Sequence, residues 1–372
     1  MKKIFRYASL LAAAVMLFAS CGDPDSGQIG GDEPEIEEGD LVIDVDKLII
    51  RADGTDASTF TVKIGDKELT EGVTFYDGNN KPVDLGPSFK FTTSEAGEYS
   101  FWANYKTFNS NTVTITSVVT EVPETPADPQ PENTSFVRRV LVTKFTGQQC
   151  QYCPNATASL HKFFDEHELA DHTVKAEAHT FSNDDPAYLA GSFYSVSAFP
   201  TIVTDWSVLT TDVSYESISS IITDRYNSQV AKAGISVNSK YAGGAITLKV
   251  CVKAAESGQY RVGAWLLEDG IQGQQKGAPT GEENSWYHVY NDCIRIADSK
   301  QGTAYSGLKL GVIEEGKTAE KMFTWTLKDS WKVENLKLCI FVSVPDEDGR
   351  SYEVNNVITA PINGITPFEY AE

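Results

Sequence analysis

The chain has 372 residues, of which 41% are hydrophobic and 22% are charged, a balance that allows ordinary apolar cores. At roughly 100–200 residues per domain, this length predicts two or three domains. The formal net charge of −21 argues against binding to nucleic acid or to anionic lipid by charge, because both need a basic surface.

The N-terminus has the pattern of an export signal. Basic residues within 2–6 precede an apolar stretch over 7–19, which is shorter than the about 20 residues that span a bilayer. Small residues then precede Cys21, and this resembles the processing site of bacterial lipoproteins. We expect residues 1–20 to be a signal peptide and Cys21 to carry the lipid anchor. The alternative is a plain secretory peptide with an incidental Cys21.

The next two segments predict a tether and a β-sandwich. Residues 21–40 are acidic and contain neither Lys nor Arg, so we expect a flexible tether. Residues 41–118 contain about seven short β-branched or aromatic segments separated by turn signals, which favours an immunoglobulin-like β-sandwich. Residues 119–134 are rich in proline and predict a semi-rigid, extended linker.

Residues 135–233 alternate between strand and helix patterns. Residues 140–142 predict a buried strand, and the apolar spacing over 156–164 predicts a helix. Further helices are expected over 188–195 and 215–231. Alternating strands and helices predict an α/β domain.

Residues 234–372 return to strand patterns and predict a second immunoglobulin-like β-sandwich. Cys251 and Cys339 each alternate onto the strand face that also carries Lys. We therefore hypothesise a structural disulfide between Cys251 and Cys339 that leaves Cys293 free. The pairing of the three cysteines stays open, because connectivity cannot be deduced from sequence.

The most specific motif is Cys150-Gln151-Tyr152-Cys153, which follows a strand and a turn and is expected to open a helix. A helix N-terminus stabilises a thiolate, and the two sulfurs at this spacing are close enough to bridge. We expect Cys150 to attack and the more sheltered Cys153 to resolve the mixed disulfide. A fixed structural disulfide is the main alternative. Half of a zinc site is disfavoured, because a second ligand pair is missing.

Pro200 precedes a predicted strand, and with the upstream dithiol this arrangement resembles thioredoxin-like domains. In such domains a cis-proline packs against the CxxC motif, and the preceding residue, here Phe199, offers backbone hydrogen bonds to a substrate. His179 ends a strand and is a candidate supporting residue. Lys144 stands near the position where such domains commonly carry a proton-shuttling acid. It would favour a thiolate but leaves proton transfer from the resolving cysteine in doubt.

Several segments together resemble a family called outer membrane protein 28-related. They are Phe145–Ala156 with the dithiol, His179, Ala198–Thr201, Leu266–Asp269 with Gln274, and Tyr287–Arg295. The resemblance spans roughly 137–365 and implies a thioredoxin-like domain followed by an immunoglobulin-like domain at the outer membrane. It implies no proven reaction, and an adhesin role has been proposed for relatives.

Two functions follow as hypotheses. The first is thiol–disulfide exchange on exported proteins. The second is a non-enzymatic outer-membrane or surface lipoprotein that binds proteins or glycans, in which Cys150–Cys153 is a structural staple. We expect anchoring through acylated Cys21 on either face of the outer membrane. We expect no cofactor, no metal and no nucleic acid.

Overall fold

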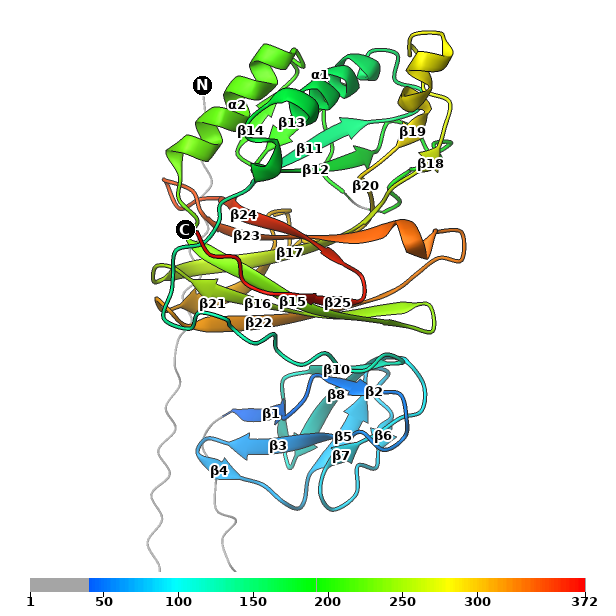
Figure 1. The fold of residues 1–372 in the computed structure, drawn as a ribbon. Coiled ribbons are helices and arrows are strands. Elements are labelled where there is room, and N and C mark those ends of the chain that lie inside the picture. Colours follow the sequence, from blue (N-terminus) through cyan, green and yellow to red (C-terminus); the bar gives the residue numbers. More distant parts are fainter. Residues whose placement is uncertain (1–39, 192, 372) are drawn as a thin grey trace, which may run out of the picture.

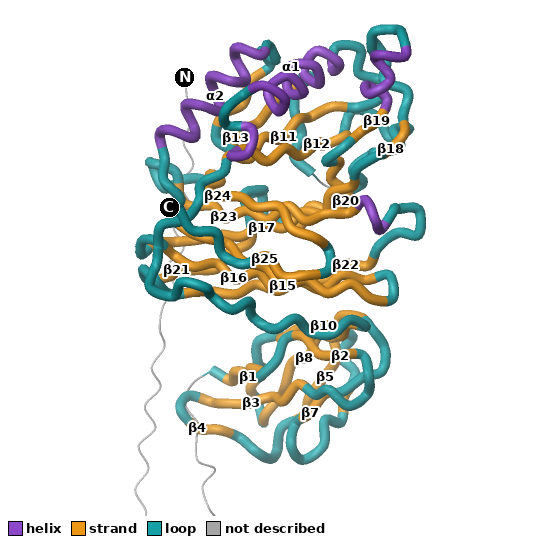
Figure 2. Tube along the Cα trace, viewed as in Figure 1, coloured by secondary structure: helices purple, strands orange, loops and turns teal. Residues whose placement is uncertain are grey.

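The computed structural model describes residues 40–191 and 193–371. The expected signal peptide, the lipidated Cys21 and nearly all of the acidic tether therefore lie outside the described residues. The described chain is rich in strands and forms several sheets around separate cores (Figures 1 and 2). This confirms the β-rich, multi-domain organisation that the sequence predicts. Within the described ranges, the helices are too short or too polar to cross a membrane.

The N-terminal unit contains ten strands: β1 (Leu41–Val45), β2 (Ile49–Arg51), β3 (Ser58–Ile64), β4 (Lys67–Glu68), β5 (Thr74–Asp77), β6 (Pro82–Val83), β7 (Lys90–Phe91), β8 (Gly97–Tyr105), β9 (Phe108–Asn109) and β10 (Val113–Val118). One sheet has the order β1-β3-β4 with β7 on β3, and the other has the order β2-β10-β8-β5-β6 with β9 on β8. Side chains alternate across each strand, so both sheets turn an apolar row inward. Phe60 lies at the centre, with ring centroids 5.1 Å from Phe75 and 5.3 Å from Phe101.

The middle of the chain forms a small α/β layer. Its elements are β11 (Val140–Thr146), α1 (Cys153–Glu166), a 3-10 turn (Ala170–His172), β12 (Thr173–His179), β13 (Thr201–Thr204), β14 (Val208–Thr210) and α2 (Tyr215–Ser228). β11 pairs in parallel with β12 and antiparallel with β13, which gives the order β14-β13-β11-β12. Both α-helices cover one face, where Val142, Leu160 and Ile218 share a core.

The helix expected over 188–195 is wrong for the residues that the structure describes there. The segment between β12 and β13 contains no helix among these residues. Leu189, Phe193 and Tyr194 instead pack from an irregular segment against the core beneath β11. These apolar side chains pack against the core from an irregular backbone, so their helical spacing did not indicate a helix.

The C-terminal unit is a second sandwich that continues the α/β sheet. Its strands are β15 (Ala233–Ala242), β16 (Ala245–Ala254), β17 (Gly258–Glu268), β18 (Ile271–Gln272), β19 (Val289–Tyr290), β20 (Cys293–Asp298), β21 (Leu308–Ile313), β22 (Thr318–Thr326), β23 (Leu336–Pro345), β24 (Tyr352–Pro361) and β25 (Gly364–Thr366); 3-10 turns cover Glu282–His288 and Val333–Asn335. One sheet has the order β22-β16-β15-β25. β20, β17, β23 and β24 continue the sheet beyond β12, with β21 on β17. The junction is a single register pair, Glu177 with Cys293.

The layers follow one another from the helices to the N-terminal unit (Figure 1). Below the helices, β11–β14 lie over β17, β23 and β24, and the sheet of β15 and β16 lies below these strands. Phe145, Trp265 and Phe341 pack between the first two strand layers. Trp265 and Phe341 form an edge-to-face pair with ring centroids 4.9 Å apart. The α/β layer and the C-terminal unit therefore share one hydrophobic core.

The hypothesised Cys251–Cys339 disulfide is contradicted, since both thiols are free and buried. Cys251 lies on the outer face of β16, packed with Phe136 and Phe368. Cys339 lies on β23 and faces the core beneath the α/β layer. The alternation predicted each strand face correctly, but the two strands belong to opposed sheets whose outer faces point apart.

Residues 119–134 contain neither helix nor strand and lie against the outer face of the β15–β16 sheet. Thr120 is buried and donates to the hydroxyl of Thr247 at 2.6 Å. The ammonium of Lys253, 1% exposed, pairs with Asp128 at 2.7 Å and also donates to the carbonyl oxygen of Pro131. The segment is therefore anchored by side chains along its length.

We expect Asp128→Ala to release this segment and to lower the free energy of unfolding by about 2 kcal/mol, between the values for exposed and buried pairs. Although burial opposes the charge, hydrogen bonds from Lys253 and Tyr370 lower the pKa of Asp128. The stability that the Asp128 carboxylate contributes is therefore fully present above the unfolded-state pKa of about 3.9. It is lost as the pH falls through the lower folded-state pKa. Urea unfolding and limited proteolysis within 119–134 test this. Equal cleavage in Asp128→Ala and in the exposed control Glu132→Ala would contradict it.

Candidate functional site

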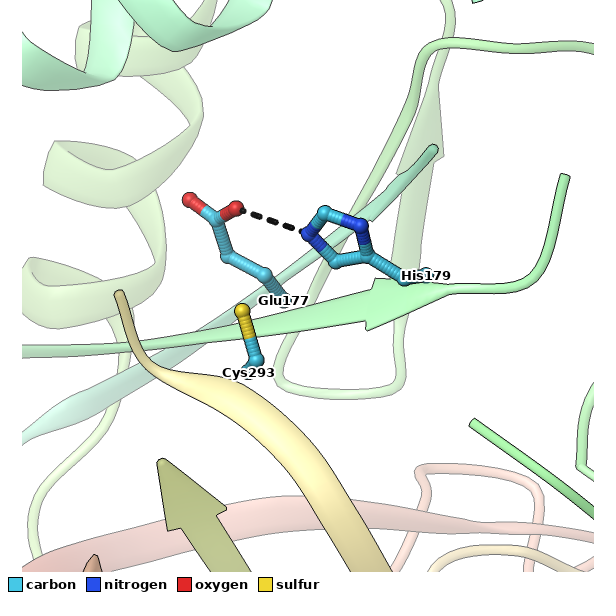
Figure 3. A group of neighbouring side chains, drawn as sticks. All are labelled: Glu177, His179 and Cys293. Carbon is cyan, nitrogen blue, oxygen red and sulfur yellow. Dashed lines mark ion pairs between the residues drawn. The ribbon is translucent and has the colours of Figure 1, made fainter. Parts of the chain in front are cut away.

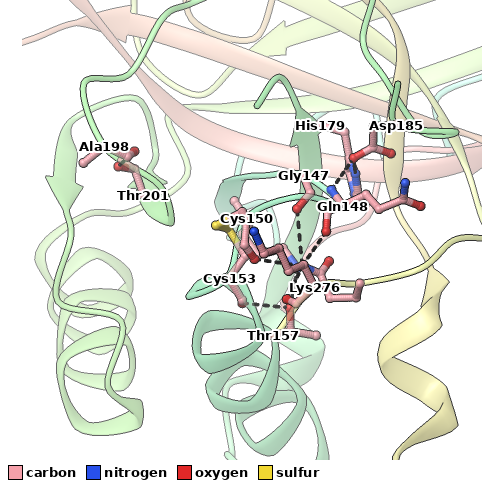
Figure 4. The surroundings of a disulfide bond; sticks show 12 residues. Gly147, Gln148, Cys150, Cys153, Thr157, His179, Asp185, Ala198, Thr201 and Lys276 are labelled. Carbon is pink, nitrogen blue, oxygen red and sulfur yellow. Dashed lines mark hydrogen bonds and ion pairs between the residues drawn. A yellow bond between two sulfur atoms is a disulfide. The ribbon is translucent and has the colours of Figure 1, made fainter. Parts of the chain in front are cut away.

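Cys150 and Cys153 form a disulfide with an S–S distance of 2.08 Å and a Cα separation of 5.4 Å (Figure 4). α1 begins at Cys153, so Cys150 lies in the turn that leads into the helix. The prediction that Cys150 is the first residue of this helix is therefore wrong. Both residues are buried, with exposed fractions of 2% and 0%. Attack on either sulfur from solvent therefore requires a local movement.

The Phe199–Pro200 peptide bond is cis, as the sequence predicted. Thr201 donates its hydroxyl to the carbonyl oxygen of Ala198 at 2.7 Å and closes the loop around the proline. Thr201 is also the register partner of Phe145 at the end of β11. The proline loop and the dithiol turn therefore lie at the same end of the sheet, where β11 ends and β13 begins. In Figure 4 the sulfur atoms point to the side on which the loop lies.

A loop of the C-terminal unit, residues 273–278, packs on the dithiol turn. The buried side chain of Gln275 donates from Nε2 to the carbonyl oxygen of Cys150 at 3.0 Å and to carbonyl groups of the preceding turn. Gly277 has φ +77°, and a Cβ atom there would lie 2.1 Å from the carbonyl oxygen of Gln151. Only glycine fits this approach. The C-terminal unit therefore holds the dithiol turn in place.

We expect Gln275→Ala to loosen the turn and to speed reduction of the disulfide. Losing these buried hydrogen bonds costs about 1–2 kcal/mol, which corresponds to roughly 5–30-fold more frequent opening. The rate of reduction by dithiothreitol, followed by thiol alkylation and mass spectrometry, measures this. Gln272→Ala, which removes an exposed glutamine at the end of β18 directly before this loop, is the matched control. Equal rates in the two variants would show that the loop does not restrain the disulfide.

A polar cluster lies buried beside the dithiol turn on β11 and β12. The ammonium of Lys144 is 2.8 Å from Oε1 of Glu177, and the ammonium of Lys175 is 3.1 Å from the same oxygen. His179 Nδ1 lies 2.9 Å from Oδ2 of Asp185. Since β11 and β12 are parallel neighbours, their inward side chains share the face that α1 covers. The cluster thus connects both strands beneath the helix.

The cluster is linked to the dithiol through main-chain groups. Lys144 donates to the hydroxyl of Thr157 at 3.0 Å, and Thr157 donates to the carbonyl oxygen of Cys153 at 3.2 Å. Asp185 accepts the N–H group of Gln148 in the turn before Cys150. The ammonium of Lys144 is therefore paired with Glu177, and it reaches Cys153 through Thr157.

Ionisation within the cluster is shifted by burial and by neighbouring charges. Burial lowers the pKa of Lys144. Although burial opposes the carboxylate, the ammonium groups of Lys144 and Lys175 hold the pKa of Glu177 well below its usual range. Burial also opposes the charged form of His179, but Cys293 and Asp185 raise the pKa of His179 well above its ordinary value. The cluster therefore favours charged forms of Glu177 and His179.

A cavity of about 800 Å³ opens between α1, β12 and the C-terminal unit. Its lining includes the polar residues Lys144, Glu177 and His179 and the aromatic residues Trp286 and Tyr290. Its size and mixed lining are typical of a small-molecule pocket.

Sequence reasoning missed Glu177, Asp185, Gln275 and Cys293. Lys175, Glu177 and His179 alternate along β12, a pattern that indicated a shared face but not its burial. The cluster and the cavity form only when segments far apart in the sequence meet, so no local pattern shows them.

Together, the fold and the site define a β-rich, multi-domain protein with a CxxC disulfide beside a cis-proline loop. Residues 190–364 match the family described as outer membrane protein Omp28. This match confirms the resemblance to the outer membrane protein 28-related family, and the family's name points to the outer membrane. The matched region begins after the dithiol, so the family model does not cover Cys150 and Cys153.

Two solved structures are similar to this chain to different extents. HBP35 of Porphyromonas gingivalis is 14% identical, with a TM-score of 0.50, and the alignment covers 61% of this chain and 76% of that chain. A structural-genomics protein from Agrobacterium tumefaciens is 13% identical, with a TM-score of 0.38 and coverage of 62% and 97%. The first similarity concerns the fold alone, and the second is too low to support a conclusion. No curated protein matches the chain.

Proposed function

We propose that this chain is a cell-envelope lipoprotein, anchored in the outer membrane through acylated Cys21, whose Cys150–Cys153 dithiol exchanges disulfides with exported proteins. The observation that carries the proposal is the disulfide at the start of α1, on the sheet edge that also carries the cis Phe199–Pro200 bond. The strand order β14-β13-β11-β12, with α1 and α2 on one face, supports a thioredoxin-like domain. The flanking sandwiches are then immunoglobulin-like modules.

The exchange runs through one mixed disulfide. The Cys150 thiolate attacks a partner disulfide, forms a mixed disulfide and releases one partner thiolate. The Cys153 thiolate then attacks the Cys150 sulfur, which regenerates the intramolecular disulfide and releases the second partner thiolate. Solvent protons neutralise the released thiolates. In the opposite direction, the Cys150–Cys153 disulfide oxidises a partner dithiol by the same steps reversed.

The two cysteines differ in the way that this mechanism needs. Cys153 is the first residue of α1 and is fully buried, which suits a resolving thiol. Cys150 lies one turn earlier, where the helix N-terminus favours its thiolate. Lys144 occupies the position where an acid was expected. Its contacts with Glu177 and Thr157 support a role as a positively charged group held beneath the dithiol.

Alkylation of the reduced protein over a range of pH tests the proposal. We expect Cys150 to react with iodoacetamide at mildly acidic pH, because its thiolate fraction exceeds that of an ordinary cysteine with a pKa of about 8.5. Cys251 and Cys339 are internal controls, since burial raises the pKa of both thiols. A Cys150 that reacts as slowly as these two buried thiols would refute exchange.

The burial of both sulfurs favours a second candidate, a non-enzymatic surface or outer-membrane lipoprotein in which the disulfide is a staple. The loop of residues 273–278 covers the dithiol turn and strengthens this alternative. It predicts that Cys150→Ser leaves binding to a cell-surface ligand intact and that protease reaches the domains on whole cells. Reactive Cys150 in the alkylation experiment would count against it.

A further inference from the structure

We propose that Glu177, His179 and Cys293 form a binding site for Zn²⁺ or a chemically similar late first-row divalent metal ion. The site goes beyond the proposed function, because it does not use the dithiol. One ligand atom from each residue lies within 4.8 Å of the others, and all three residues are buried (Figure 3). A nitrogen, a thiolate sulfur and a carboxylate oxygen form a ligand set that suits zinc.

The sheet register brings the three side chains together. Glu177 on β12 is the register partner of Cys293 on β20, and the two strands are parallel there. Parallel register partners turn their side chains to the same face, and His179 lies two residues further along β12 on that face. The site therefore exists only because the α/β layer and the C-terminal sandwich share one sheet.

His179 is oriented as a metal ligand. Nδ1 of the ring lies 2.9 Å from Asp185, which fixes the ring and leaves Nε2 directed toward the cluster. Nε2 is buried and, within the described residues, has no hydrogen-bond partner. A carboxylate bound to the second nitrogen of a ligating histidine is a recurring feature of zinc sites. A metal ion that binds this buried nitrogen displaces the proton that the charged form of His179 carries there.

The separation of His179 from Glu177 fits one edge of a tetrahedral site. His179 Nε2 is 3.6 Å from Oε2 of Glu177, which is too long for a hydrogen bond. Two donor atoms that each lie about 2.0–2.1 Å from one tetrahedral zinc ion are roughly 3.3–3.4 Å apart. A shift of a few tenths of an ångström therefore closes this edge. Oε1 of Glu177 is held by Lys144 and Lys175, so Oε2 is the oxygen left to bind the metal.

The surrounding charges can accommodate a divalent cation. The ammonium groups of Lys144 and Lys175, which pair with Glu177, repel a cation. Asp185 and Asp292 supply further carboxylates, and Asp292 is 3.2 Å from the ammonium of Lys175. Metal binding removes the proton from the Cys293 thiol and the proton from Nε2 of His179, so a thiolate joins these carboxylates and the imidazole is neutral. Lys337, 2.6 Å from Asp292, is also paired with Asp269 at 2.7 Å. Four carboxylates and the thiolate then balance three ammonium groups and the divalent ion.

The fourth coordination position faces the cavity. Glu177 and His179 both line it, so water or a small ligand can complete the coordination. The Tyr290 ring centroid is 4.7 Å from that of His179, and its buried hydroxyl has no partner among the described residues. This hydroxyl is available to a polar molecule bound beside the metal.

Co²⁺ and Zn²⁺ binding to the full chain tests the proposal. The protein is kept free of reductant, so that the Cys150–Cys153 sulfurs stay in their disulfide. We expect one Co²⁺ per chain with a thiolate-to-cobalt charge-transfer band, and one sulfur with nitrogen and oxygen ligands in X-ray absorption of the zinc-loaded protein. Cys293→Ser should abolish the band, and Asp185→Asn should weaken Zn²⁺ binding roughly 10–100-fold.

Cys339→Ser is the matched control, because Cys339 is equally buried but faces a different core. It should bind Co²⁺ with the same band and affinity as the parent protein. Absence of binding, bound metal without a sulfur ligand, or an unchanged band in Cys293→Ser would each overturn the proposal. If Cys293→Ser does not fold, X-ray absorption of the parent protein alone decides between a sulfur-ligated and a sulfur-free ion.

Discussion

Replacing Cys150 with serine is expected to reduce disulfide exchange to the uncatalysed rate, because the attacking sulfur is then absent. Replacing Cys153 with alanine is expected to leave the first step intact and to remove the second. Mixed disulfides between Cys150 and exported partners should then accumulate. Non-reducing electrophoresis of envelope fractions, followed by mass spectrometry of the trapped species, measures both results.

Cys339→Ser is the control for this experiment, since it removes a buried thiol outside the dithiol. It should change neither the exchange rate nor the set of trapped proteins. The exchange hypothesis fails if Cys150→Ser retains the parent rate, or if Cys153→Ala traps no protein that the double variant Cys150→Ser/Cys153→Ala lacks.

Asp205→Ala is expected to cause the largest loss of stability in the α/β layer, about 3–5 kcal/mol. Asp205 directly follows β13 and is fully buried. Its carboxylate lies 2.7 Å from Arg138 and 3.3 Å from Arg225, and it accepts the N–H group of Leu141 at 2.8 Å. The variant leaves two guanidinium groups and a buried N–H group without this acceptor. Urea unfolding followed by circular dichroism measures the loss.

Asp205→Asn separates the charge from the shape of this side chain. It can still accept from Leu141 and tolerates the positive φ of this position, so we expect a smaller loss than for alanine. Asp171→Ala, which removes an exposed carboxylate nearby, should cause no comparable loss. A loss below about 1 kcal/mol in Asp205→Ala would contradict the role assigned to this ion cluster.

The features that sequence reasoning predicted correctly are those encoded by neighbouring residues. Alternating apolar residues identified strands such as β16 and β23, and helical spacing identified α1 and α2. Both patterns report local geometry, which is why they needed no knowledge of the packing. The cis bond before Pro200 was predicted instead from the resemblance to thioredoxin-like domains.

The features that it missed depend on which strands become neighbours. Cys251 and Cys339 lie on the predicted faces, but opposed sheets keep them apart. Glu177 meets Cys293 only because β20 of the C-terminal unit extends the sheet of β12. Glu177 and His179 on β12 are buried beside α1 and the C-terminal unit, which the alternation along this strand does not show. Strand order and burial are set by the whole chain, so a local pattern could not predict this site.

Redox titration of Cys150 and Cys153 in the full chain tests the central claim most directly. Equilibration with glutathione or dithiothreitol buffers, acid quenching and mass measurement give the reduction potential of the pair. An exchanging dithiol should give a value between about −270 and −120 mV, the range of thioredoxin-fold exchangers. A potential below about −300 mV would contradict exchange and identify the disulfide as a structural staple.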